Sequence, residues 1–210
     1  MKTIQRFIVS LFAALLATIF VSTPDAAPYQ KGDVKLQSIG PLATGPDGVL
    51  FVSDPKAASI IAIKTEAKPT DKSPGNFKVE GLNAKVAAVL GASVDQVRIV
   101  DLAVDSASKT AYMSVVRGQG ADANAVVVSV HPSGKIHVLS LKNVQHSVAK
   151  LSNAPDDKET GTGRRRRNQR MESITDIAFA KGKVIVAGLS NEEFSSTLRT
   201  IPFPFEGSQK

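Results

Sequence analysis

Two aspartates, Asp101 and Asp176, are the residues whose placement most directly suggests chemistry. Each stands third in a five-residue phrase of the form Ile-x-(Pro/Asp)-(Leu/Ile)-Ala. The phrase occurs at 39–43, 99–103 and 174–178. Carboxylates that recur at one place in a repeat can converge on a cation or on the hydroxyl groups of a sugar. Alternatively, each aspartate fixes a turn or a neighbouring unit by accepting hydrogen bonds from backbone amides. The first copy carries Pro41 at this place, which interrupts any ring of carboxylates.

A run of four arginines is the strongest charge feature of a chain whose formal net charge is +7. It consists of Arg164, Arg165, Arg166 and Arg167. Such a run can bind anionic lipids, acidic glycans or nucleic acid. No aromatic residue flanks it to stack on bases, so nucleic acid is not an expected partner and the run is a candidate anion-binding loop. The alternative is a solvated loop that proteases cut.

The three histidines offer little for a metal site. His131 and His137 flank a turn, and if Ser133-Gly134 is its two-residue tip, the two imidazoles project from opposite faces of the hairpin. His146 stands alone in a polar segment and is expected to be exposed. The chain has no cysteine, which excludes disulfides, thiolate metal sites and a cysteine nucleophile. No Gly-x-Ser-x-Gly phrase occurs either, so no catalytic residue and no metal ligand set is predicted.

The elements that must position these residues are short segments rich in Val and Ile, divided by turns. Four of them follow one another in the middle of the chain, at 97–105, 110–117, 125–131 and 136–141. Four short antiparallel strands in one repeat are typical of a β-propeller blade. The three phrases predict three such units. We place the units at about 34–81, with its last strand at 77–80, at 95–142 and at 171–205.

Two insertions account for the uneven spacing of the units. Leu82, Val86, Val89 and Leu90 lie at helical spacing before Gly91, which predicts one short amphipathic helix at 83–90 that packs on a blade. The segment 152–171 contains Asn, Asp, Gly, Arg and Gln with hardly an apolar residue. It is expected to be an exposed loop without regular structure.

The stretch 39–64 resembles a repeat of the NHL-type or gluconolactonase/regucalcin-type β-propellers. In those families the phrase Pro-Asp-Gly-x-Leu-(Phe/Tyr)-Val-(Ser/Ala)-Asp marks the turn and second strand of a blade, and Pro46 to Asp54 reads PDGVLFVSD here. Quinone-dependent sugar dehydrogenases are similar at this turn. The resemblance implies blades and specifies no chemistry. Regucalcin-like lactonases hold a divalent metal with a glutamate, an asparagine and an aspartate, and no glutamate stands in the corresponding region before Ile39.

The expected fold is therefore all-β, a partial β-propeller of about three four-stranded antiparallel blades with one short inserted helix. Closed propellers have roughly four to eight blades, so three blades leave open edges. We expect the chain to belong to a longer propeller whose reading frame is truncated. The alternatives are self-association through the open blade edges, or pairing of the segment 34–38 with the last unit.

Residues 1–27 have the features of a secretory signal peptide. Two basic residues precede an apolar run from Phe7 to Val21, and small residues lead to Ala27. The run is shorter than the roughly 20 residues that a membrane-spanning helix needs, which favours a cleaved signal over a signal anchor. We expect a periplasmic or secreted domain at 28–210, with no stable membrane insertion after cleavage.

Two functions from different classes fit these features. The leading hypothesis is an exported propeller-type scaffold or binding protein of unknown ligand. The alternative is a metal-assisted lactonase or a sugar-oxidising propeller enzyme, which needs polar ligands that converge in the central channel. The sequence specifies no cofactor; a divalent cation such as calcium is the one that Asp101 and Asp176 would favour.

Overall fold

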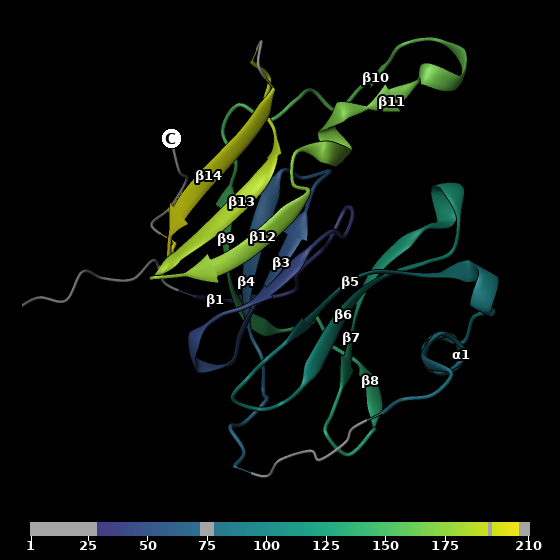
Figure 1. The fold of residues 1–210 in the computed structure, drawn as a ribbon, viewed down its shortest axis with the longest axis vertical. Helices are drawn as coiled ribbons and strands as arrows, with labels where there is room; N and C mark the ends of the chain where they lie inside the picture. The colour runs from purple at the N-terminus through teal and green to yellow at the C-terminus, as the bar shows by residue number, and fades with distance from the viewer. Residues whose placement is uncertain (1–28, 72–77, 193–194, 206–210) are drawn as a thin grey trace, which may run out of the picture.

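The computed structural model describes residues 29–71, 78–192 and 195–205 of the 210-residue chain. The proposed signal peptide at 1–27 lies outside the described residues. The described residues form three antiparallel sheets, a small separate hairpin and one α-helix, which confirms the expected all-β, partial-propeller-like fold with one short helix (Figure 1). No helix among them is long and apolar enough to cross a membrane.

The three sheets contain five, four and three strands rather than four each. The first sheet has the strand order β1-β9-β4-β3-β2. Its strands are β1 (Gln30–Gly32), β2 (Leu42–Thr44), β3 (Val49–Asp54), β4 (Ser59–Lys64) and β9 (Val144–Lys150). The second sheet contains β5 (Val97–Val104), β6 (Ala111–Arg117), β7 (Asn124–Val130) and β8 (Ile136–Val138) in chain order, and the third contains β12 (Asp176–Ala180), β13 (Lys183–Leu189) and β14 (Ser196–Pro202).

The first sheet lies between the other two, and its central strands β3 and β4 are buried on both faces. Phe51 and Ile60 pack toward Val186 of the third sheet, whereas Leu50 and Ile61 point the other way. The opposite face packs against Tyr112, Val127 and other side chains of the second sheet. This explains why residues 49–52 of β3 and 60–63 of β4 are continuous apolar runs instead of alternating ones.

The helix α1 (Leu82–Leu90) covers the far face of the second sheet. Val86 of the helix packs with Met113, Val115 and Val128 in a third core. Gly91 ends the helix with φ of 59°, the left-handed conformation that glycine adopts without strain. The predicted helix at 83–90 and its glycine cap are therefore confirmed.

The outer part of the first sheet differs from the expected one. The strand expected at 77–80 lies partly outside the described residues, and residues 78–80 form no strand. Its place is taken by β9, which follows the second sheet in the chain and pairs with β4. The N-terminal strand β1 then pairs with β9. Residues 34–38 form no strand, and the backbone N–H of Val34 donates to the carbonyl of Leu141, so the alternative that 34–38 pairs with the last unit is wrong.

The segment 152–171 contains regular structure, contrary to expectation. It holds the hairpin of β10 (Glu159–Thr160) and β11 (Arg167–Asn168), which lies beside the third sheet in Figure 1. Short 3-10 turns occur at Gly163–Arg165 and Gln169–Glu172. Its polar side chains are joined by an exposed ion pair between Arg166 and Glu159 and by a hydrogen bond of 2.6 Å from Asn168 to Asp157.

The strands β2, β5 and β12 are each an edge strand of one of the three sheets, and they lie next to one another, β12 beside β2 and β2 beside β5. Each carries or directly follows one copy of the repeated phrase. This arrangement brings the third position of all three phrases to a common region of the molecule.

Candidate functional site

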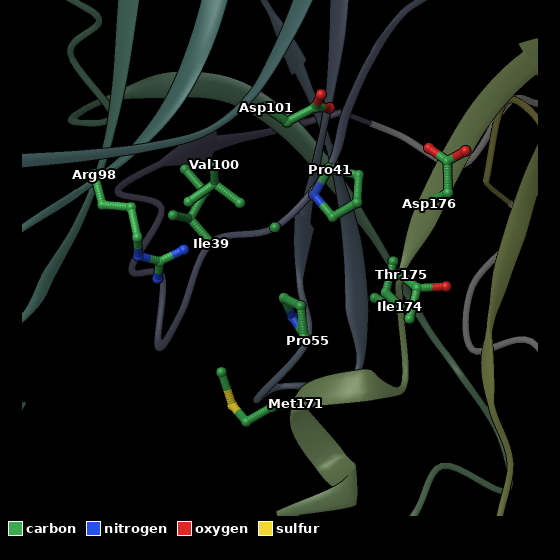
Figure 2. A pocket seen from close by; sticks show the side chains of 11 residues that line it. Ile39, Pro41, Pro55, Arg98, Val100, Asp101, Met171, Ile174, Thr175 and Asp176 are labelled. Carbon is green, nitrogen blue, oxygen red and sulfur yellow. The ribbon is translucent and has the colours of Figure 1, made fainter. Parts of the chain in front are cut away.

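A pocket of about 380 Å³ opens where β2, β5 and β12 begin (Figure 2). Asp101 and Asp176 both line it, together with Pro41 from the first copy of the phrase. The rest of the lining is Ile39, Gly40, Pro55, Arg98, Val100, Met171, Ile174 and Thr175. The repeat therefore places its third-position residues around one pocket.

A β-bulge in β5 sets the direction of Asp101. Ile99 pairs with Val115 and Asp101 pairs with Ser114, which leaves Val100 as an extra residue. An inserted residue bends a strand and redirects the side chains that follow it. The bulge allows the consecutive residues Val100 and Asp101 both to line the pocket.

Each aspartate uses one oxygen to hold the backbone. Oδ2 of Asp101 accepts a hydrogen bond of 2.8 Å from the backbone N–H of Leu42, which joins the second sheet to the first. Oδ1 of Asp176 accepts one of 2.8 Å from the N–H of the next residue, Ile177. The structural role that the sequence left open is thus present. The second oxygen of each carboxylate has no hydrogen-bond partner among the described residues.

The strand β12 is held against the first sheet just before it begins. The hydroxyl of the buried Ser173 donates a hydrogen bond of 2.9 Å to the carbonyl of Pro55, and Pro55 itself lines the pocket. Gly188 of β13 lies so close to Ser173 that a Cβ atom there would overlap its carbonyl group. The glycine is therefore needed for β13 to approach this segment.

Arg98 and Thr175 complete the polar lining, and the sequence did not single out either of them. Figure 2 shows the Arg98 guanidinium on β5, away from the carboxylates of Asp101 and Asp176. Arg98 is exposed and forms no ion pair with another described residue. The sequence signal that could have identified Arg98 is its position two residues before Val100 on the same strand. Thr175 stands beside Asp176 and presents an exposed hydroxyl.

The pocket offers few ligands to a metal. No group of three or more His, Asp or Glu side chains that could hold a metal ion occurs in the described ranges 29–71, 78–192 and 195–205. Ca²⁺ takes roughly six to eight oxygen ligands. A calcium ion between Asp101 and Asp176 would therefore depend on water and main-chain oxygens for most of its coordination.

The arginine run lies at the tip of the β10–β11 hairpin and its four side chains are exposed. Arg166 forms an ion pair with Glu159 across the hairpin. Arg164, Arg165 and Arg167 form no ion pair with a described residue. The four side chains surround a surface hollow of about 450 Å³. Three of the four charges are therefore available to an anion.

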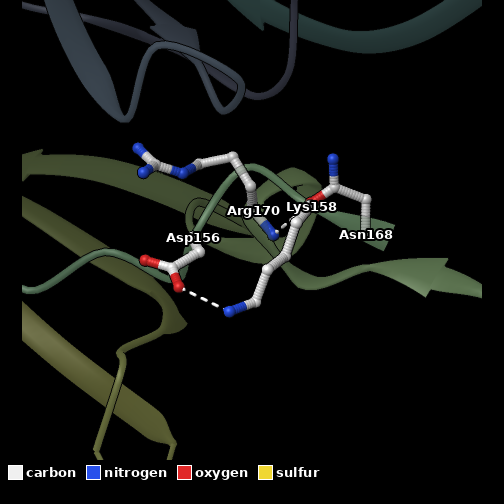
Figure 3. Close-up of polar contacts among 4 residues, drawn as sticks. All are labelled: Asp156, Lys158, Asn168 and Arg170. Carbon is white, nitrogen blue, oxygen red and sulfur yellow. Dashed lines mark hydrogen bonds and ion pairs between the residues drawn. The ribbon is translucent and has the colours of Figure 1, made fainter. Parts of the chain in front are cut away.

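Polar contacts hold the base of this hairpin (Figure 3). Lys158 donates a hydrogen bond of 2.8 Å to Asp156, and this bond and the lysine charge hold the pKa of Asp156 below its ordinary value. The side chain of Asn168 accepts a hydrogen bond of 3.0 Å from the backbone N–H of Arg170. The next residue, Met171, lines the pocket, so the hairpin leads directly into it.

A second, larger pocket of about 910 Å³ lies between the ends of the first and second sheets. His131 and His137 line it, and both were expected to point in opposite directions. That expectation was wrong, because Val130 pairs with Ile136 and the turn contains three residues, ending at Gly134 with φ of 81°. The shift by one residue places both imidazoles on one face, with ring centroids 5.7 Å apart.

His146 is also placed differently from the expectation. It lies in β9, between β4 and β1, and only 6% of its surface is exposed. Its Nδ1 lies 3.1 Å from the carbonyl of Val144, and its Nε2 lies 3.1 Å from the side-chain nitrogen of Gln30. Both ring nitrogens are thus engaged within the first sheet.

No family model and no curated protein matches the chain. Among solved structures, the PQQ-bound form of aldose sugar dehydrogenase from Streptomyces coelicolor is 14% identical, with 89% of this chain and 85% of that chain covered and a TM-score of 0.24. A streptogramin B lyase structure is 10% identical, with 84% of this chain and 59% of that chain covered and a TM-score of 0.18. Likeness at this level assigns neither a family nor a function.

Proposed function

We propose that this chain is an exported, propeller-type binding protein that holds a small solute rich in hydroxyl groups in the pocket between β2, β5 and β12. The observation that carries the proposal is that Asp101, Asp176, Thr175 and Arg98 all line one pocket of about 380 Å³. This volume lies within the range of roughly 300–1,000 Å³ that is common for small-molecule sites.

The polar groups suit a carbohydrate-like ligand. The free oxygens of Asp101 and Asp176 can accept hydrogen bonds from hydroxyl groups, and Arg98 can donate to ring or hydroxyl oxygens. Hydrogen bonds to charged groups contribute about 1.5–3 kcal/mol each. Pro41 and Val100 provide apolar surface for the carbon skeleton between them.

The site is held in place before a ligand arrives. The bond from the Leu42 N–H orients Asp101, and the bond from Ser173 to Pro55 fixes the start of β12. Side chains that are already oriented lose little conformational entropy when they bind.

The test is calorimetric titration of the purified chain with a panel of neutral monosaccharides. At least one sugar should bind in a one-to-one ratio, and Asp176→Asn should weaken it by about tenfold or more, since one charged hydrogen bond is lost. Asp176 is exposed, so this variant should keep the fold. The matched control is Asp95→Asn, an exposed aspartate outside the pocket. Equal affinity in the two variants, or no binding of any sugar, would contradict the proposal.

Calcium in the same titration distinguishes the alternative of a metal-assisted lactonase or sugar-oxidising enzyme. That alternative requires both aspartates to hold one ion. Tight calcium binding that is lost in Asp101→Asn as well as in Asp176→Asn would favour the enzyme. The asparagine at 101 keeps an oxygen that can accept the Leu42 N–H, so a loss of calcium would not reflect a loss of the contact between the sheets.

Export is the second part of the proposal and rests on the signal-like segment 1–27. A periplasmic or secreted product should begin near Pro28 when the full chain is expressed in a bacterial host. N-terminal sequencing of the exported protein checks this. Recovery of the chain only with Met1 at its start would contradict export by a cleaved signal.

A further inference from the structure

His131 and His137 form a pair of imidazoles at the edge of the larger pocket, which shares no lining residue with the aspartate pocket. They flank the turn between β7 and β8, and the register of the hairpin puts them on the same face of the second sheet. Their ring centroids are 5.7 Å apart and the ring planes meet at 83°. We propose that this pair binds one divalent transition-metal ion, of the copper or zinc class.

The separation of the rings is close to that of two imidazoles on one metal ion. With metal–nitrogen distances of about 2.0–2.1 Å and a tetrahedral angle, the two ring centroids are about 5.2 Å apart. The observed 5.7 Å is about half an ångström longer, and the rings meet edge to face, so rotation of the two side chains about χ1 and χ2 has to bring one nitrogen of each to the ion. The hairpin backbone need not move, because the bond of 2.9 Å from the His131 N–H to the Lys135 carbonyl fixes the turn.

Both side chains are free to bind. They are exposed, and neither ring has a hydrogen bond with another described residue. His146 is the opposite case, since both of its nitrogens are occupied and it is buried. Among the described residues, His131 and His137 are therefore the histidines whose ring nitrogens are both free to bind a metal ion.

The ligand type selects the metal. Neutral imidazole suits zinc, copper and nickel, whereas calcium and magnesium prefer oxygen ligands. Among divalent ions of the first transition row, Cu²⁺ binds nitrogen ligands most tightly. We therefore expect Cu²⁺ to bind more tightly than Zn²⁺.

Two protein ligands leave coordination positions for water or for a small donor molecule. The lining of the adjoining pocket includes Tyr112, Ser129, Lys64 and Lys142. Among its described lining residues, Glu66 alone is acidic. A metal ion there would face hydroxyl groups and cations, which favours a small anionic co-ligand such as a carboxylate. Binding of such a co-ligand is a consequence of the site and is not needed for its test.

The test is titration of the untagged chain with Cu²⁺ and Zn²⁺, followed by calorimetry. One ion should bind per chain, and His131→Ala and His137→Ala should each weaken binding at least tenfold. Both residues are exposed, so circular dichroism should show an unchanged fold. Lys135→Ala, in the same turn, is the matched control and should bind as the unchanged chain does. Equal binding in the two histidine variants and the control would overturn the proposal.

Two further readouts locate the ion. The electron paramagnetic resonance spectrum of bound Cu²⁺ should show coupling to two imidazole nitrogens, and to one in either histidine variant. In Tyr29→Phe, the remaining tyrosine is Tyr112, whose fluorescence Cu²⁺ should quench because Tyr112 lines the same pocket. A spectrum unchanged by both histidine substitutions, or no quenching, would place the ion elsewhere. Asp176→Asn should leave metal binding intact, which separates this proposal from that of the solute site.

Discussion

At the scale of single residues, the two tyrosines of the chain report on different cores. Tyr29 packs beside the core between the first and third sheets, and Tyr112 belongs to the core between the first and second. Burial, and secondarily the charge of Asp47, raises the pKa of Tyr29 from 10.0 to about 12. Burial is also the main cause that raises the pKa of Tyr112, against the effect of its hydrogen bond to Thr65.

We expect neither tyrosine of the folded protein to ionise at its ordinary pKa of 10.0. Tyrosinate absorbance should rise late, with Tyr29 titrating at about pH 12. Folding favours the neutral phenol, so the contribution of Tyr29 to stability is complete below pH 10 and is lost as the pH rises through about 12. The variants Tyr29→Phe and Tyr112→Phe assign the two steps. A tyrosine that ionises at pH 10 while circular dichroism still shows the native fold would contradict this.

The sequence indicated the relative placement of the two aspartates better than that of the histidines. Asp101 and Asp176 line one pocket because the repeat sets their position on equivalent strands, and a repeat is visible in the chain itself. The relation of His131 to His137 depends on whether the turn contains two or three residues. The sequence Pro132-Ser133-Gly134 is compatible with both turns. Only the folded hairpin shows that Gly134 is left-handed and that the turn is the longer one.

At the scale of elements, local signals predicted well and distant pairings did not. The helix α1 follows from its apolar spacing and its glycine cap, and the buried run of β3 follows from its composition. The strand β9 gave no comparable signal, since it contains Gln, His, Ser and Lys. Its neighbours β4 and β1 lie far away in sequence, and they supply the burial that its own composition does not indicate.

The hairpin of β10 and β11 is expected to be the first site of proteolysis. It is joined by two residue pairs only, and its ion pair between Arg166 and Glu159 is exposed, where such pairs contribute about 0–1 kcal/mol. Brief trypsin digestion should therefore cut between Arg164 and Arg170 and leave the sheets on either side associated. The fragments can be identified by mass spectrometry.

Resistance of this segment, with cuts in the sheets instead, would show that packing or a bound anion orders the arginines. The variant Glu159→Gln is the control, because it removes the ion pair with Arg166. In this variant trypsin should make its first cut at the same place and at least as fast as in the unchanged chain.

At the scale of the whole molecule, the first sheet couples the two others. It contributes one face to each of the two cores that flank it, so neither outer sheet can separate without exposing side chains of the first. The outer face of the third sheet has no such cover within the described chain, and Leu198 there is 70% exposed. Self-association through an open blade stays a prediction.

This coupling predicts that the three sheets unfold together. Fluorescence of Tyr112 in Tyr29→Phe and of Tyr29 in Tyr112→Phe should report the two cores separately, because the chain has no tryptophan. Each variant is unfolded in urea and followed by tyrosine fluorescence and by circular dichroism. Within each variant the two signals should give the same unfolding midpoint, which allows for the effect of the substitution itself on stability. Separate midpoints for the two tyrosines would show that the sheets unfold independently.

The place of β9 also has a consequence for the order in which the protein can be assembled. A chain that leaves the ribosome, or enters an export channel, from its N-terminus presents β2, β3 and β4 long before Val144–Lys150 appears. Until then the edge of β4 is unpaired, and β1 has no strand to join. The strands made first are thus the ones that must wait for their partner. During this interval an apolar sheet edge is open to other chains or to a chaperone.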